Sequence, residues 1–261
     1  MRLIKRDISC IFTLKKVIII IASAIIIGEL ILANIPYGNY SSMDVIFKFL
    51  AGPNVRGEAK NNTEILIWLS TQIVFLTILG QFLYDEFRFN YIYSILRIKS
   101  KTSWVISKMV SILIFTLVYY GIYLCVIYLL SNVALKNHTL RFNQVLNDFS
   151  IFMDYIGSEE KFILYNMTIN ILSTYLNAMI FFIINVITLN VRWTFISVLV
   201  YEIISISITG PFNLVNNSFL SERYWTNISD KFSIFYLLLT IIFVCVISII
   251  VVNFKENLEI D

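Results

Sequence analysis

Long apolar runs, separated by short polar segments, form the main pattern along this chain. A helix needs about 20 predominantly apolar residues to cross the hydrocarbon core of a bilayer. The runs are continuous rather than alternating, which favours helices over transmembrane β-strands. The fifth run is the shortest and is polar at its end. Together they predict six spans, at about 17–35, 65–83, 109–130, 163–188, 193–209 and 232–254.

The first 16 residues carry a different pattern. Ile4, Ile8, Ile11 and Phe12 follow the i, i+4, i+7, i+8 spacing of one helical stripe, and most of the basic residues lie off that stripe. This arrangement predicts an amphipathic helix at 1–16 that rests in the membrane interface with its apolar side down. The alternative interpretation is a plain topology signal made by the basic residues.

Composition agrees with a chain that lipid surrounds. Of its 261 residues, 58% are hydrophobic and 14% are charged, whereas soluble domains carry about 25% charged residues. We therefore predict an all-α polytopic membrane protein that forms a single domain over 1–261. The net charge of +3 is small, and we expect no nucleic-acid partner. The heavy use of Ile, Asn, Lys, Phe and Tyr is typical of a low-GC bacterial genome.

The distribution of Lys and Arg predicts the orientation. Twelve of the 20 lie in the N-terminal segment, the connections between spans two and three and between spans four and five, and the C-terminal tail. The other eight are spread over the longer loops 36–64, 131–161 and 210–231. We therefore expect a multi-pass protein of the bacterial cytoplasmic membrane with both termini in the cytoplasm.

The segment 82–108, "FLYDEFRFNYIYSILRIKSKTSWVISK", is charged and aromatic, and it lies between two apolar runs. Phe87, Tyr91, Ile95 and Ile98 share one arc of a helical wheel, while other apolar residues point elsewhere. A helix outside the membrane with apolar residues on several faces indicates a protein partner, and its Tyr, Phe and Arg are typical of interface cores. The alternative is a solvated loop with interfacial anchors.

The end of that segment predicts the start of span three. In "SKTSW", Ser100 or Thr102 can cap a helix. Trp104 and Lys108 are then expected at the level of the lipid headgroups.

At these residues the chain resembles the coupling-helix region of ABC exporter permeases of the type-2 family. The shared pattern is an acidic residue that closes span two, a short helix, an R-x-x-S-[KR]-x-x-[WF] turn and a Lys that opens span three. The N-terminal helix, the six spans and the short connection between spans four and five also match. This chain departs from the family where Phe87 and Arg88 replace a common glycine, and in its long loop between spans three and four. The residues that carry the resemblance are Glu86, Arg97, Ser100, Lys101, Trp104 and Lys108.

The resemblance implies the permease subunit of an ATP-driven exporter that moves an amphipathic or hydrophobic cargo out of the cell by alternating access. An antimicrobial or cytolytic peptide would be such a cargo. Two permease chains, identical or paired with a sister chain, would bind separate ATPase chains, which would hold ATP and magnesium; no cofactor is expected in this chain. The ATPase-coupling residues would be Glu86, Arg88, Tyr91, Ile95, Arg97, Lys99 and Lys101.

Motifs for catalysis are absent from the sequence. A P-loop needs G-x-x-x-x-G-K-[ST], and the nearest string, "GPNVRGEA", keeps both glycines but lacks the Lys and the Ser or Thr. His138 is the only histidine, which argues against most zinc sites and against a Ser-His triad. We therefore expect neither enzymatic activity nor a metal site. The alternative to an exporter subunit is a membrane immunity or sensor protein that binds a peptide without an ATPase.

Polar residues inside the predicted spans are candidates for a translocation path. A charge at the centre of a span costs roughly 2.5–3.5 kcal/mol, so it should face the bundle interior or a wet cavity. For Glu29 the alternative is a side chain that reaches outward to the interface. For Glu202 it is a protonated or hydrogen-bonded helix contact, and for Asn170 and Asn177, on one face of span four, it is adhesion between helices.

The last predicted outer loop, "GPFNLVNNSFLSERYW", begins with a Gly-Pro break. Its aromatic and apolar content predicts that it turns back toward the membrane. The resemblance implies short re-entrant helices there that close an outer gate.

Overall fold

The computed structural model describes residues 2–35, 40–54, 62–90, 100–135, 159–208, 213–215 and 218–254. Within these ranges the chain is almost entirely helical and has no β-strand. This confirms the predicted all-α class. Five helices are long and apolar enough to cross a membrane: α2 (Leu14–Ala33), α4 (Asn62–Asp85), α6 (Lys101–Ala134), α9 (Glu159–Thr188) and α12 (Asp230–Phe254).

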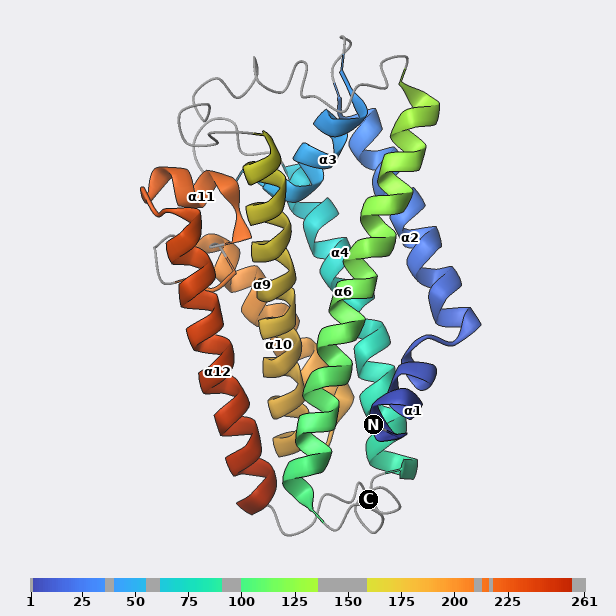
Figure 1. Cartoon of the computed structure of the whole chain (residues 1–261), viewed down its shortest axis with the longest axis vertical. Coiled ribbons are helices and arrows are strands. Elements are labelled where there is room, and N and C mark those ends of the chain that lie inside the picture. Colours follow the sequence, from blue (N-terminus) through green and yellow to red (C-terminus); the bar gives the residue numbers. More distant parts are fainter. Residues whose placement is uncertain are drawn as a thin grey trace.

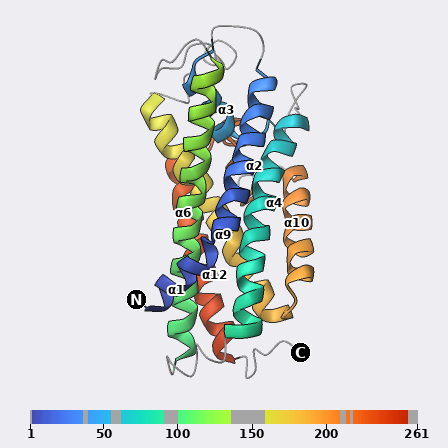
Figure 2. The same ribbon diagram turned by 90° about the vertical axis from the view of Figure 1, so that its right-hand side faces the viewer.

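The long helices run side by side in one bundle (Figures 1 and 2). Helix α9 packs on α12, α10 and α6, and α6 packs on α2. A short helix, α1 (Arg2–Ile11), lies at the end of the bundle where α12 finishes, which we call the inner end. Two further short helices, α3 (Ser42–Ala51) and α11 (Leu220–Trp225), lie at the opposite, outer end.

The helix boundaries lie within a few residues of the predicted runs, except that α6 begins eight residues before the apolar run of span three, at Lys101. The sequence predicts a cap at this start, and the Ser100 hydroxyl accepts the Ser103 N–H at 3.4 Å. Helix α10 (Val191–Ser207), which corresponds to the fifth predicted span, has 17 residues. At 1.5 Å per residue it is about 26 Å long, shorter than the hydrocarbon core of a typical bilayer.

The N-terminal helix is shorter than the predicted 1–16, since α2 already begins at Leu14. Its apolar stripe faces the bundle: Ile11 is fully buried, and the ring centre of Phe12, just beyond α1, lies 5.7 Å from that of Phe115 in α6. Asp7 lies on the same inward face and is also fully buried. Helix α1 therefore packs on α6 and α4 through a face that is partly charged.

Helix α4 does not end cleanly at its inner end. It continues through a π-helical turn, η1 (Glu86–Asn90). Most of the helix that the sequence predicts between spans two and three follows this turn and lies outside the described residues. Four of the predicted coupling residues belong to that stretch: Tyr91, Ile95, Arg97 and Lys99.

Candidate functional site

Four charged side chains meet at the inner end of the bundle. Arg6 and Asp7 come from α1, Glu86 from η1 and Lys108 from α6. The Lys108 Nζ lies 2.7 Å from Asp7 Oδ2 and 2.9 Å from Glu86 Oε1. An Arg6 guanidinium nitrogen lies 3.0 Å from Asp7 Oδ1 and 2.8 Å from Glu86 Oε1. Two positive and two negative groups balance, so this inner cluster is neutral as a whole.

Uncharged donors complete the coordination of the two carboxylates. The Trp104 indole N–H donates to Glu86 Oε1 at 3.1 Å. The hydroxyls of Ser107 and Ser111 each donate to Asp7 Oδ2 at 3.4 Å. All three donors lie in the first three turns of α6. Their spacing, at positions 104, 107 and 111, places them on one face of that helix.

The inner cluster is closed to solvent. Asp7 and Lys108 have no exposed surface, and the Glu86 side chain is 2% exposed. The Lys108 ammonium also lies 5.3 Å from the centre of the Phe82 ring. Partial burial lowers the pKa of Arg6, but the carboxylates of Glu86 and Asp7 outweigh that effect and raise it, so Arg6 stays charged. Each buried charge therefore has an opposite charge in contact with it.

A second feature is a line of polar side chains on α9. Asn166, Asn170, Thr174 and Asn177 are spaced i, i+4, i+8 and i+11, so they share one face. The Asn170 amide donates to the backbone carbonyl of Leu50 in α3 at 2.9 Å. One face of α9 thus makes polar contacts from the outer end of the bundle to its middle.

Thr174, a member of the polar line on α9, links α9 to two other helices. Its hydroxyl accepts a hydrogen bond from the Gln72 amide of α4 at 3.3 Å and is 2.8 Å from the Tyr120 hydroxyl of α6. All three side chains are buried. The contact fixes the mutual position of α4, α6 and α9 at mid-depth.

Below this point, Asn177 meets Glu202 of α10. The Asn177 amide donates to Glu202 Oε1 at 3.1 Å, and Glu202 is fully buried. The other carboxylate oxygen, Oε2, has no hydrogen-bond partner among the described residues. No cationic side chain of the described residues forms an ion pair with it. This geometry is that of a hydrogen-bonded helix contact, the alternative that the sequence offered for Glu202.

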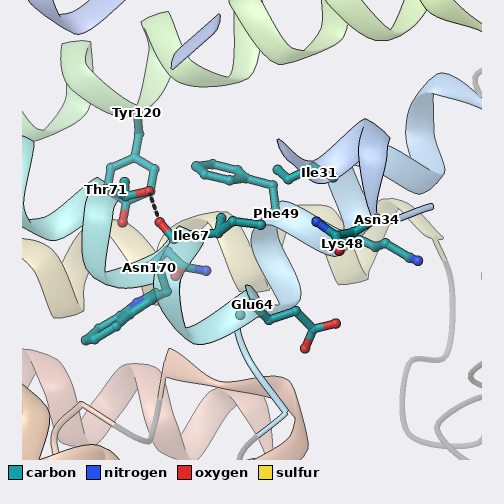
Figure 3. Close-up of a pocket in the computed structure, with 11 residues that line it drawn as sticks. Ile31, Asn34, Lys48, Phe49, Glu64, Ile67, Thr71, Tyr120 and Asn170 are labelled. Atoms are coloured by element: carbon teal, nitrogen blue, oxygen red, sulfur yellow. Dashed lines mark hydrogen bonds between the residues drawn. The ribbon is translucent and has the colours of Figure 1, made fainter. Parts of the chain in front are cut away.

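A small pocket lies at the outer end of the same polar line (Figure 3). Its volume is about 40 Å³, which is room for about three water molecules. Thr71 and Tyr120 lie on one side of it, and Lys48 lies toward the other (Figure 3). The lining comes from α2, α3, α4, α6 and α9 and includes Ile31, Asn34, Lys48, Phe49, Glu64, Ile67, Trp68, Thr71, Tyr120 and Asn170.

The two short helices α3 and α11 close the outer end of the bundle. Helix α3 starts with a reciprocal cap, in which Ser41 and Asp44 each accept the other's backbone N–H. It ends at Gly52, whose φ of +70° suits glycine. A methyl group at Gly52 would lie 2.9 Å from the Phe219 ring, so the two outer segments touch directly. The Ser221 hydroxyl also donates to the Pro53 carbonyl at 3.2 Å.

Arg223 of α11 anchors the outer loop. It is fully buried, with its Nε 3.1 Å from Asp230 Oδ1 and a guanidinium N–H donated to the Ser218 carbonyl at 3.1 Å. It also donates to the side-chain oxygen of Asn166 in α9. The last outer loop thus turns back onto the bundle, as its apolar content predicts.

The remaining predicted site residues lie apart from one another. Arg88 is exposed on η1 and bonds the Tyr84 hydroxyl. Lys101 is half-buried at the first residue of α6. Glu29 is exposed on α2, whereas Glu202 is fully buried. Of the four predicted path residues, Asn177 and Glu202 contact each other, and Asn170 lines the small pocket at the outer end.

Sequence reasoning missed the partners inside the inner cluster. Trp104 and Lys108 are fully buried, because the carboxylates of Glu86 and Asp7 and the packing of α1 enclose them. Their position at the level of the lipid headgroups stays a prediction. Asp7 was not a candidate at all. One signal was available: an acidic residue on the apolar stripe of an amphipathic helix must either disrupt packing or find a cation.

Comparison with known proteins identifies no relative. The chain matches no protein-family model, no curated protein and no solved structure.

Proposed function

We propose that this chain is the membrane subunit of an ATP-driven exporter. In this proposal α10 is a sixth, short span, the inner end faces the cytoplasm, and both termini lie there. A separate ATPase chain binds the segment between α4 and α6 and supplies ATP and magnesium. A second membrane chain, identical or related, completes the transporter.

The inner cluster is the observation that carries this proposal. It binds α1 to the end of α4 and to the start of α6, which are the two ends of the segment predicted to dock an ATPase. A push on that segment moves both ends, and through Asp7 and Arg6 it also moves α1 and the start of α2. Buried, mutually paired charges suit this task, because they hold one geometry and resist sliding.

The geometry of the outer end supports the proposal that this structure is a closed, resting conformation of the exporter. The outer pocket, which α3 lines in part, has room for about three waters, and that is far too little for a peptide or a lipid. The anchored Arg223 and the contact of Gly52 with Phe219 hold the two short helices together over it. Export would require this cap to move, and the polar line on α9 connects the cap to mid-depth.

The second chain would cover the exposed face of α2. Glu29 lies on that face among Ile25, Ile26 and Leu30, all of them exposed. A carboxylate next to hydrocarbon is costly, so a wet path or a partner suits it better than lipid. An amphipathic or hydrophobic cargo fits such a path, because its walls are aliphatic with few charges.

The test is copurification with an ATPase chain, whose gene the proposal expects beside that of this chain. The full chain would be coexpressed with that ATPase, as wild type and as the double variant Arg97→Glu/Lys99→Glu. Both positions belong to the predicted docking segment, and neither is one of the four residues that define the inner cluster. A matched control is Lys231→Glu, an exposed charge reversal at the outer end. We expect the ATPase to bind the wild type and the control but not the double variant.

Two outcomes would contradict the proposal. If no ATPase binds the wild type, a peptide-binding immunity or sensor protein becomes the better account. If the ATPase binds the double variant as well as the wild type, it docks elsewhere, and the inner cluster loses its assigned role.

A further inference from the structure

An open groove between α4 and α10 is larger than the outer pocket. Its volume is about 360 Å³. It lies toward the inner end, where α4 approaches its last turns and α10 begins. The lining residues are Leu76, Thr77, Gly80, Gln81, Val191, Arg192, Phe195 and Ile196.

The groove is hydrocarbon along its length and polar at one end. The Thr77 hydroxyl is bonded within its own helix, because it donates to the Ile73 carbonyl of α4 at 2.7 Å. Gln81 and Arg192 stand at the inner end of the groove and are exposed. This is the polarity of a lipid, with an apolar chain and a polar head.

Arg192 has no partner within the part of the chain that the structure describes. No ion pair or side-chain hydrogen bond engages its guanidinium, whereas Arg6 and Arg223 are both paired. It lies in the first turn of α10, where the helix dipole also favours an anion. The next residue, Trp193, is 64% exposed, as expected of an aromatic side chain at headgroup level.

We propose that this groove binds one anionic phospholipid, with an acyl chain between α4 and α10 and the phosphate on Arg192. A second copy of this chain is the competing occupant, and charge argues against it. A twofold contact places the same patch on both sides of the interface. The groove lining has no Asp or Glu, so a copy of the same lining would bring no counter-charge to Arg192. An anionic headgroup supplies that counter-charge. The inference does not depend on an ATPase.

The experiment uses the purified full chain, stripped of lipid in detergent and titrated with phosphatidylglycerol or phosphatidylcholine of the same acyl chains. The readouts are the thermal unfolding midpoint and native mass spectrometry of retained lipid. We expect phosphatidylglycerol to raise the midpoint more and to stay bound. Arg192→Gln should weaken phosphatidylglycerol about fivefold, the effect of one basic residue near anionic lipid. Lys15→Gln, a matched exposed cation at the same end, should not.

A second variant tests the groove itself. Thr77→Trp fills the apolar part on an exposed face, and it should reduce the binding of both lipids. Equal stabilisation of the wild type by the two lipids would overturn the role of Arg192. Loss of lipid selectivity in Lys15→Gln but not in Arg192→Gln would place the site elsewhere. A dimer without retained lipid that Thr77→Trp dissociates would assign the groove to a second copy.

Discussion

The inner cluster and the contact between Asn177 and Glu202 show two ways to bury a carboxylate in this bundle. In the inner cluster, Glu86 has two cations within 3 Å and an indole N–H at 3.1 Å. Glu202, equally buried, has one amide at 3.1 Å and an oxygen with no described donor. The first is a set of interdependent ion pairs, and the second is a single polar contact between two helices.

This difference predicts how each region responds to substitution. Removing one member of a buried ion network leaves the others with an uncompensated charge, which costs about 3–5 kcal/mol. Replacing a lone hydrogen-bonding acceptor by another acceptor keeps the contact and changes little. Substitutions that change a charge in the inner cluster should therefore lower the stability of the protein. At the contact between Asn177 and Glu202, only a substitution that removes the hydrogen bond should do so.

The largest effect is expected for Lys108→Met, which removes the central cation but keeps a side chain of similar length. Asp7 and Glu86 then face each other with only the partly exposed Arg6 to balance them. We expect the free energy of unfolding, measured by titration with SDS, to fall by about 3–5 kcal/mol.

Lys15→Met is the matched control for that variant, because Lys15 is an exposed lysine at the same end. It should change the free energy of unfolding by less than about 0.5 kcal/mol. The double variant Asp7→Asn/Lys108→Met should cost clearly less than the sum of its single changes, since it removes one charge of each sign. Additive costs would show that Asp7 and Lys108 are not coupled.

Arg223→Gln extends the comparison to the outer end. Arg223 is buried and charged like Lys108, but its carboxylate partner, Asp230, is 16% exposed and can be hydrated when the partner is lost. We expect a cost of about 1.5–3 kcal/mol, the range for hydrogen bonds to charged groups. Hydrogen exchange in 213–230 should speed up while exchange at the inner end stays the same. Lys231→Gln, an exposed neighbour, should leave both regions unchanged.

These regions also differ in how much of them the sequence could predict. The five long helices could be predicted from runs of apolar residues, which are a local signal. The Ser100 cap could also be predicted from a local signal, the residues that follow it. Glu202 and Asn177 could be singled out because each is a polar residue in an apolar run. The inner cluster could not, since Arg6 and Glu86 are 80 residues apart and Lys108 resembles an ordinary interfacial lysine. Pairing of distant charges is decided by tertiary packing, and a single sequence does not encode it locally.

A weaker effect is expected at Gly52, where the two outer segments meet through a steric contact without charge. Gly52→Ala places a methyl group against the Phe219 ring at a φ of +70°, so we expect a cost of about 1–2 kcal/mol. Gly121→Ala is the control, because nothing lies within 4 Å of a methyl group there and alanine favours the α6 helix. The control should be neutral or slightly stabilising in the same SDS titration. Equal effects at the two glycines would show that α3 and α11 do not touch in the folded protein.

The same substitution, glutamate to glutamine, at both buried glutamates tests the difference between the two regions most directly. Glu202→Gln keeps a carbonyl oxygen to accept from Asn177 and removes a carboxylate that no described cation balances. Its free energy of unfolding should therefore stay within about 1 kcal/mol of the wild type. Glu86→Gln takes one negative charge from a neutral cluster and should cost at least about 2 kcal/mol. If Glu202→Gln costs as much as Glu86→Gln is expected to cost, a bound cation balances Glu202, and its contact with Asn177 is part of an ion site. If both changes cost less than about 1 kcal/mol, the charges of the inner cluster are not interdependent.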